Sequence, residues 1–467
     1  MPRTAFDKLW DLHMVRAFAD GSALLALDRV FLHERTGSLA VNHVLDTGRR
    51  VAAPQRVFAV MDHVIDTVPG RTDRTMMPGG TEFITALRDA AGRAGAQLFD
   101  LDHPDQGISH VVAAELGLVL PGYSYVCPDS HACTLGALGA LAWGIGTSDC
   151  EQAVATQMLR VVKPAQTLVR IEGLLPTGTS AKDLALYVIA RFGAAGGARH
   201  AVEYAGPAIT SLDMGGRFTL CNMAVEFSAF TAVIAPDATT LAYVRDRRAA
   251  PKSAEYEAAA AAWSALASDT DAKFDRELRI DASAVAPMVS WGTALDHTVP
   301  VDGVVPAPQS LPGERRERAE RAIEYMGLAP GAPIAGQPID AAFIGSCTNG
   351  RLADLRSAAA VLRGRRVAPG VRALCVPASQ AVKRAAEAEG LREVFVDAGF
   401  EWREPGCSLC FYAGGEGFEP GQRIISSTNR NFEGRQGPRV RTHVASPAMV
   451  AASAVTGVIT DPRSLQR

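Results

Sequence analysis

Residues 341–350 read AAFIGSCTNG, and the rest of the chain can be interpreted around this stretch. The apolar run 341–344 predicts a buried strand, and residues 351–363 carry leucine and alanine at helical spacing, which predicts a helix. Cys347 is therefore expected where a strand gives way to the positive N-terminal end of a helix. Such a position binds anions and lowers the pKa of a thiol.

A second stretch, 405–410, reads PGCSLC and presents two further thiols three residues apart. The apolar run 394–396 lies upstream of it, so we expect a setting similar to that of the first stretch. Three thiolates from two loops are more typical of a metal centre than of packing. The candidate ligands are Cys347, Cys407 and Cys410.

The number of cysteines indicates which centre this could be. An iron–sulfur cubane usually takes four thiolates, whereas these loops supply three, and the next nearest cysteine, Cys375, lies alone in an apolar run typical of core. A cubane with one iron lacking a protein ligand would keep a position open for substrate. Two alternatives stay open on these residues alone: a zinc site completed by His443, or a redox pair formed by Cys407 and Cys410.

Composition narrows the class of protein. The length of 467 residues predicts two to four domains, and 48 % apolar and 21 % charged residues are ordinary for a soluble enzyme. A net charge of −3 predicts no general attraction to nucleic acid or to an anionic membrane. No apolar run reaches about 18 residues, and the first residues lack the apolar core of a signal peptide. The eight cysteines are expected to be reduced thiols, so we predict a cytoplasmic protein with no nucleic-acid or membrane partner.

Several apolar stretches end in side chains suited to catalysis. Residues 24–34, 57–64, 107–110 and 125–131 are predicted as strands, with helical stretches between them. This order predicts an α/β sheet whose carboxyl edge collects the functional groups. A single histidine is more often satisfied or solvated, but several at strand ends favour function, because a nearby carboxylate raises the pKa of imidazole and can fix its orientation. The candidates are Asp62, His63, His110, Asp129 and His131.

The domain organisation follows from changes of pattern along the chain. A strand at 168–172 and a helix at 181–192 begin a second unit, and the Pro- and Gly-rich stretch 301–315 is a candidate linker to a third. The predicted domains are 1–165, 166–300 and 301–467.

Two further groups of polar residues are candidates for a site. Asn222 and Glu226 share a face if their segment is helical, although a solvated helix face is the alternative. Arg430 and Arg435 could clamp carboxylates through bidentate pairs, although surface arginines are the alternative.

The order of these motifs resembles that of aconitase-type hydro-lyases, over nearly the whole chain. Within this family the chain is most similar to the large subunits of 3-isopropylmalate dehydratases, enzymes of leucine biosynthesis, as residues 6–10, 404–408 and 431–437 indicate. The resemblance implies three α/β domains around a central iron–sulfur cluster, with the swivel domain absent. It is carried by Asp62-His63, Asp129-Ser130-His131, Asn222 to Glu226, Gly345 to Asn349, Cys407 to Cys410 and Asn429 to Arg435.

The resemblance also implies a reaction. A 4Fe-4S cluster held by Cys347, Cys407 and Cys410 would bind a 2-hydroxy or 3-hydroxy dicarboxylic acid at its open iron, and dehydration would be followed by rehydration at the neighbouring carbon. His63 is expected to protonate the departing hydroxyl. The implied pairs around the iron are Asp62 with His63, His110 with Asp129, and His131 with Glu226. The residues expected to contact substrate or to lie beside the cluster are Ser130, Asn222, Asn429, Arg430 and Arg435.

One catalytic group of the family has no match in this chain. The base that removes the proton from carbon is, in the family, a serine in a Gly-Ser-Ser-Arg-Glu type loop on a mobile domain, and residues 426–429, SSTN, lack that pattern. We therefore expect a separate small subunit that carries the swivel domain and the serine loop. The chain alone is expected to be inactive.

Three segments depart from the usual pattern of 3-isopropylmalate dehydratases. They are 35–38, 132–136 and 411–415, all beside the predicted site. A paralogue acting on another malate-like acid, such as citramalate, homocitrate or a specialised-metabolism analogue, is therefore an alternative, and Leu135 and Phe411 could instead alter only packing. From other classes, the alternatives are a cluster-sensing RNA-binding regulator, which the near-neutral charge disfavours, and a colourless zinc-binding structural protein.

Overall fold

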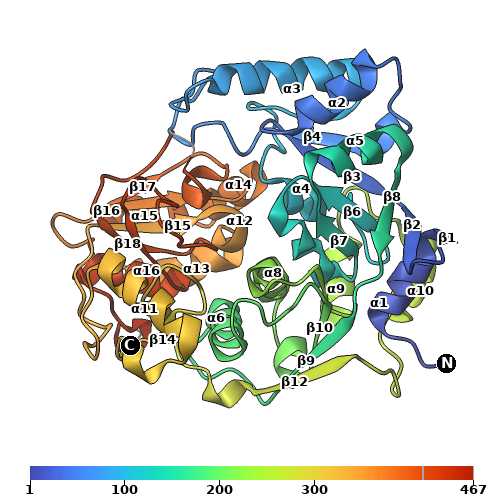
Figure 1. Cartoon of the computed structure of the whole chain (residues 1–467). Helices are drawn as coiled ribbons and strands as arrows, with labels where there is room; N and C mark the ends of the chain where they lie inside the picture. The colour runs from blue at the N-terminus through green and yellow to red at the C-terminus, as the bar shows by residue number, and fades with distance from the viewer. Residues whose placement is uncertain (413–414, 466–467) are drawn as a thin grey trace. The chain divides into compact units, whose positions relative to one another are not determined.

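The computed structural model describes residues 1–412 and 415–465, so Ala413 and Gly414 of the third departing segment lie outside the described residues (Figure 1). The chain forms two compact units. Unit 1 comprises Met1–Ile65, Gly79–Leu174 and Gly197–Asp281. Unit 2 comprises Asp66–Pro78, Leu175–Gly196 and the chain from Ala282 onward.

A five-stranded parallel sheet positions the candidate residues of unit 1. Its strand order is β5-β4-β3-β6-β7, so β3 lies between β4 and β6. The central strand is apolar and almost fully buried, as expected for a parallel sheet covered on both faces. The strands are β3 (Arg29–His33), β4 (Val57–Val60), β5 (Gln97–Phe99), β6 (Ser124–Cys127) and β7 (Leu141–Gly144), and the helices that connect them include α2 (Gly37–Asp46), α3 (Gly80–Ala94), α4 (Ser109–Glu115) and α5 (Thr147–Thr156).

Two smaller sheets complete unit 1. One is antiparallel, in the order β1-β2-β8, and the other is parallel, in the order β11-β10-β9-β12. Their strands are β1 (Met14–Ala17), β2 (Ser22–Ala26), β8 (Met158–Val162), β9 (Gln166–Glu172), β10 (Ala201–Ala205), β11 (Thr231–Val233) and β12 (Arg276–Asp281). The remaining helices are α1 (Ala5–His13), α7 (Pro207–Thr210), α8 (Met214–Met223), α9 (Ala238–Arg245) and α10 (Ser253–Ser264), with the 3₁₀ segments η2 (Ser130–Leu138) and η3 (Ala224–Phe227).

Unit 2 is built on a second five-stranded parallel sheet, in the order β17-β16-β15-β18-β19. Its apolar core joins this sheet to flanking helices, with Leu355 and Leu362 of α13 fully buried. The strands are β15 (Ala341–Gly345), β16 (Arg372–Val376), β17 (Phe400–Trp402), β18 (Arg423–Ser426) and β19 (Arg441–Val444), with a hairpin of β13 (Met288–Ser290) and β14 (Thr298–Pro300). The helices include α6 (Ala181–Phe192), α11 (Gly313–Met326), α12 (Ser346–Asn349), α13 (Leu352–Leu362), α14 (Gln380–Ala388), α15 (Leu391–Ala398) and α16 (Pro447–Thr456).

Much of the predicted local structure is confirmed. The run 341–344 is the buried strand β15, a short helical turn and α13 follow it, and 181–192 is helix α6. Parallel sheets flanked by helices confirm the α/β class. Within the described residues, no helix combines the length and the apolar character that a membrane span requires.

Three local predictions are wrong. Residues 24–34 form two strands of different sheets, because Asp28 interrupts the run and accepts a hydrogen bond from the backbone of Ser124 at 2.9 Å. Residues 107–110 are not a strand, because Ser109 begins α4. Residues 394–396 belong to α15, and β17 precedes the second cysteine stretch instead; a three-residue apolar run does not distinguish strand from helix.

Candidate active site and metal centre

The first histidine–carboxylate pair of unit 1 follows β4. Nδ1 of His63 lies 2.6 Å from Oδ1 of Asp62, and the other carboxylate oxygen of Asp62 accepts a hydrogen bond from the backbone N–H of Ser109 at 3.0 Å. Burial alone would lower the pKa of His63, but the charge and hydrogen bond of Asp62 raise it to about 10. His63 is therefore an imidazolium at neutral pH.

The second pair follows β6. Nε2 of His131 lies 2.7 Å from Oε1 of Glu226, and Nδ1 of the same ring lies 3.3 Å from Oγ of Ser130. Asp129 is the N-cap of η2, and its carboxylate accepts from the backbone N–H of His131 at 2.9 Å. Glu226 comes from η3 rather than from a continuous helix with Asn222, because α8 ends at Met223.

Asp129 connects the histidines electrostatically. Burial would raise its pKa, but the hydrogen bond with His131 and the positive charges of His63, His131 and His110 lower it well below its ordinary value. The structure thus brings together all the candidate histidines and carboxylates of unit 1. Asn222 is buried beside them, and its side-chain amide donates to Oγ1 of Thr134 at 2.9 Å.

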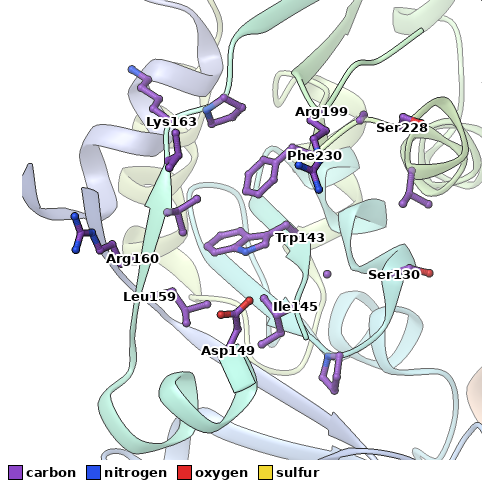
Figure 2. A pocket seen from close by; sticks show the side chains of 17 residues that line it. Ser130, Trp143, Ile145, Asp149, Leu159, Arg160, Lys163, Arg199, Ser228 and Phe230 are labelled. Atoms are coloured by element: carbon purple, nitrogen blue, oxygen red, sulfur yellow. The ribbon is translucent and has the colours of Figure 1, made fainter. Parts of the chain in front are cut away.

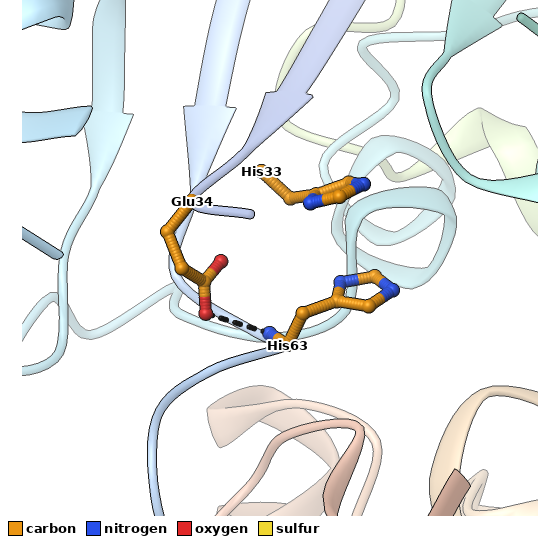
Figure 3. Close-up of side chains that lie close together, drawn as sticks. All are labelled: His33, Glu34 and His63. Atoms are coloured by element: carbon orange, nitrogen blue, oxygen red, sulfur yellow. Dashed lines mark hydrogen bonds between the residues drawn. The ribbon is translucent and has the colours of Figure 1, made fainter. Parts of the chain in front are cut away.

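Two residues of this cluster were missed by the sequence analysis as site residues. His33 is the last residue of β3, and Glu34 follows it. Figure 3 shows the ring of His33 facing that of His63, with the Glu34 carboxylate at the backbone of His63. Burial and the charge of His63 lower the pKa of His33 to about 4, so this ring is neutral at neutral pH. The available signal was a polar pair at the end of an apolar strand, which does not reveal what the pair contacts.

The candidate ligands of unit 2 come from two short loops and are all buried. Sγ of Cys347, in α12, lies 3.8 Å from Sγ of Cys410. Asn429 lies beside them and donates to Sγ of Cys347 at 3.0 Å. Cys407 immediately precedes the 3₁₀ turn η6 (Ser408–Cys410).

Backbone strain accompanies both cysteine loops. Ser346 and Ser408, each next to a candidate ligand, have φ angles of 66° and 45°. A residue other than glycine held in this region costs on the order of 1–3 kcal/mol and tends to occur at functional sites. Gly345 has a φ of 148° and lies so close to β16 that a Cβ would lie 2.5 Å from the carbonyl oxygen of Val376.

Arg435 shows an unused hydrogen-bonding group beside the thiols. Its guanidinium lies 3.6 Å from Sγ of Cys410, and its buried Nε–H has no acceptor within the described residues. Buried polar groups are normally paired, so this donor is available to a ligand. Arg430 belongs to the same loop and is half-buried.

The structure disfavours the zinc alternative. Nε2 of His443 accepts a hydrogen bond from Arg423 at 2.9 Å, and its Nδ1–H donates to the carbonyl of Ser290 at 2.6 Å. Because arginine only donates and a carbonyl only accepts, both ring nitrogens are in use and neither has a lone pair for a metal. The residues around Cys347 therefore provide three thiols and no imidazole from His443.

A hollow of about 980 Å³ lies beside the second pair in unit 1. Ser130 and Val225, next to His131 and Glu226 in sequence, form part of its wall. In the view of Figure 2, Trp143 lies between Phe230 and Asp149. Of the predicted site residues, Ser130 lines this hollow.

Unit 1 carries imidazole–carboxylate pairs after strands of its parallel sheet, and unit 2 carries three buried thiols on strained loops. These features are typical of a metal-dependent enzyme of acid–base chemistry. A model of the aconitase family (aconitate hydratase) matches residues 7–457, and the chain belongs to this family. It is accordingly a hydro-lyase with a 4Fe-4S cofactor, and the three thiols fit such a cluster better than a zinc ion.

A relative of high sequence identity agrees with this assignment. The 3-isopropylmalate dehydratase large subunit 1 of Bradyrhizobium diazoefficiens is 51 % identical over 466 residues, which cover 100 % of this chain and 97 % of the relative. Among solved structures, the holo-form of aconitase X from Thermococcus kodakaraensis aligns with a TM-score of 0.48 and 12 % identity, over 99 % of this chain and 95 % of that chain. The family assignment rests on the sequence matches.

Proposed function

We propose that the chain is the large subunit of a hydro-lyase that isomerises 3-isopropylmalate in leucine biosynthesis by dehydration and rehydration. The observation that carries this proposal is the 51 % identity, over the full length of the chain, to a 3-isopropylmalate dehydratase large subunit. The cluster would be held by Cys347, Cys407 and Cys410. When bound, it supplies a Lewis-acidic iron that polarises the carbon–oxygen bond of the substrate.

His63 is the proposed acid. Asp62 holds Nδ1 of this ring at 2.6 Å, so the proton for the departing hydroxyl is carried on Nε2. The raised pKa keeps that proton in place at neutral pH until a stronger base, the hydroxyl leaving as water, takes it. His131, oriented by Glu226, and His110, paired with Asp129, are the other proposed acid–base groups.

Arg430 and Arg435 are the proposed carboxylate clamps. The buried Nε–H of Arg435, which lacks an acceptor among the described residues, supports this role. Ser130, Asn222 and Asn429 are proposed to contact substrate, and the 3.0 Å contact of Asn429 with Cys347 supports its place beside the cluster.

The base that removes the proton from carbon is proposed to come from a separate small subunit, on a swivel domain with a serine loop. The name of the relative, a large subunit, supports a second chain.

The three-domain division 1–165, 166–300 and 301–467 remains a proposal, supported by one parallel sheet in each part. A cytoplasmic location is likewise proposed, supported by eight cysteines that form no disulfide within the described residues.

The test is an assay of the anaerobically reconstituted chain, with and without its small subunit, on a panel of malate-like acids. Turnover of 3-isopropylmalate only by the two-subunit enzyme is expected. Preference for citramalate or homocitrate would identify a paralogue, and turnover by the large chain alone would refute the separate base.

Leu135, from the second departing segment, is fully buried, which supports a packing role at that position.

A further inference from the structure

The end of the central strand β3 contacts two loops that carry candidate catalytic residues. Because β3 lies between β4 and β6, its last residues lie between the loop with Asp62 and His63 and the loop with Asp129 and His131. Glu34 contacts the first loop and His33 contacts both. The proposed mechanism does not use either side chain.

Glu34 acts on the backbone of the first loop. One carboxylate oxygen accepts from the N–H of Asp62 at 3.1 Å, and the other accepts from the N–H groups of His63 at 2.7 Å and Val64 at 2.5 Å. Ile65 adds a longer contact of 3.4 Å. Four successive N–H groups thus converge on a carboxylate that is fully buried, which fixes the turn from which the imidazole of His63 projects.

His33 acts on the ring of His63 and on the second loop. The two rings are stacked, with centroids 4.1 Å apart and planes inclined by 24°. The Nε2–H of His33 donates to the carbonyl of Pro128, which immediately precedes Asp129, at 3.0 Å. His33 therefore spans the gap between the two loops with one aromatic contact and one hydrogen bond.

The ionised form of Glu34 carries a cost at this position. Burial raises the pKa of Glu34, and the nearby charge of Asp62 raises it further, so the site opposes the ionised form. An apolar residue would avoid that cost, but it would leave the backbone N–H groups that Glu34 accepts from without this acceptor. What a carboxylate offers here is an acceptor for several backbone donors at once, which determines geometry.

A metal ion is a poorer explanation of the same cluster. Ligand atoms of His33, Glu34 and His63 lie within 4.8 Å of one another. However, both oxygens of Glu34 already accept backbone N–H groups, and Nδ1 of His63 is bonded to Asp62. A cation would have to displace these contacts.

We propose that His33 and Glu34 are positioning residues for the hydro-lyase reaction: together they fix the place of the His63 imidazole relative to Asp129 and His131. The inference rests on the proposed function for the roles of His63 and His131. It adds two residues that act on the reaction through others and do not touch substrate.

The first test uses the two-subunit holoenzyme with Glu34→Gln and His33→Phe. Glutamine offers one acceptor oxygen and turns an NH₂ group toward backbone donors, and phenylalanine keeps the stacked ring but loses the bond to Pro128. The matched control is Glu203→Gln, because Glu203 is also a buried carboxylate of unit 1, accepting from Ser268 at 2.7 Å. Glu34→Gln is expected to lower kcat on the order of 10- to 100-fold with little change in KM or iron content, while Glu203→Gln keeps kcat.

A double-mutant cycle separates positioning from general destabilisation. If Glu34 acts through His63, Glu34→Gln should cause no further loss of kcat in a His63→Asn background. Equal losses in both backgrounds, or a loss of kcat in Glu203→Gln as large as that in Glu34→Gln, would overturn the proposal.

A crystallographic readout keeps this test independent of substrate. The His63 ring is expected to be displaced by about 1 Å or to change rotamer in Glu34→Gln holoenzyme crystals, since a shift of this size is enough to reduce catalysis. If the wild-type enzyme turns over none of the acids, the proposed function fails while this measurement still stands. An unmoved ring in both the Glu34→Gln and His33→Phe crystals would contradict the positioning role.

Discussion

Nε2 of His131 lies 2.7 Å from Oε1 of Glu226, although 95 residues separate them in the chain. The two residues belong to 3₁₀ segments of unit 1, η2 and η3, and the ring nitrogen on the other side of His131 faces Ser130. A carboxylate in this position orients the imidazole and favours its protonated form.

Glu226→Gln is expected to lower kcat on the order of 10- to 100-fold, because the amide keeps the contact but loses the charge that favours the imidazolium. Steady-state kinetics of the reconstituted enzyme measure the effect. The matched control is Glu151→Gln, which alters a surface pair with His43 at 2.8 Å in the same unit and should keep kcat. A parallel loss in both variants would show that the effect is not specific to the site.

Cys347→Ser is expected to reduce the iron and sulfide bound per chain and to abolish the brown colour, because the cluster loses one of three thiolate ligands. Chemical analysis of anaerobically prepared protein measures this. The control is Cys375→Ala, which removes a buried core thiol of β16 and should keep the full cluster. Full loading of Cys347→Ser would rule out Cys347 as a ligand.

The cysteine loops and the histidine pairs differ in how far the sequence alone predicts them. An apolar run followed by a helical pattern was sufficient to place Cys347 after β15, because both signals are local. The pairing of His131 with Glu226 came from the family resemblance, since no periodicity connects residues so far apart. Glu34 was missed because its partners are backbone N–H groups, which a sequence does not distinguish.

Arg435→Lys is expected to raise KM about 10- to 100-fold, which corresponds to the loss of one charge-assisted hydrogen bond of about 1.5–3 kcal/mol. The guanidinium can hold a carboxylate in a bidentate way, whereas an ammonium cannot. Initial rates over a range of substrate concentrations measure KM. Arg439→Lys, an exposed position four residues away, serves as the control, and equal KM values in all three proteins would exclude the clamp.

The buried imidazole of His443 is expected to make the free energy of unfolding of unit 2 depend on pH in the acid range. Burial and the charge of Arg423 lower its pKa to about 3, below the ordinary 6.5. Between these values the unfolded chain binds a proton and the folded chain does not, so this contribution is complete above pH 6.5 and is lost as pH falls. From pH 6.5 to 4 the loss is on the order of 3 kcal/mol.

His443→Asn should therefore flatten the dependence of the thermal midpoint on pH below 6.5, although its midpoint at pH 7.5 is lower. Thermal unfolding monitored by circular dichroism at pH 4.5, 5.5, 6.5 and 7.5 is the measurement. His43→Asn, at an exposed histidine, should keep the wild-type slope. An unchanged slope in His443→Asn would show that other groups account for the acid sensitivity.

Gly136 lies where η2 meets β11, and a Cβ there would lie 1.7 Å from the carbonyl oxygen of Ala232. No side chain fits without moving the backbone of η2, which carries Ser130 and His131 at its start. Gly136→Ala is expected to be insoluble or to unfold at a much lower temperature. Gly146→Ala, where nothing lies within 4 Å of the added carbon, should keep the wild-type thermal midpoint. A Gly136→Ala protein that folded with the wild-type thermal midpoint and full activity would contradict the close contact between η2 and β11.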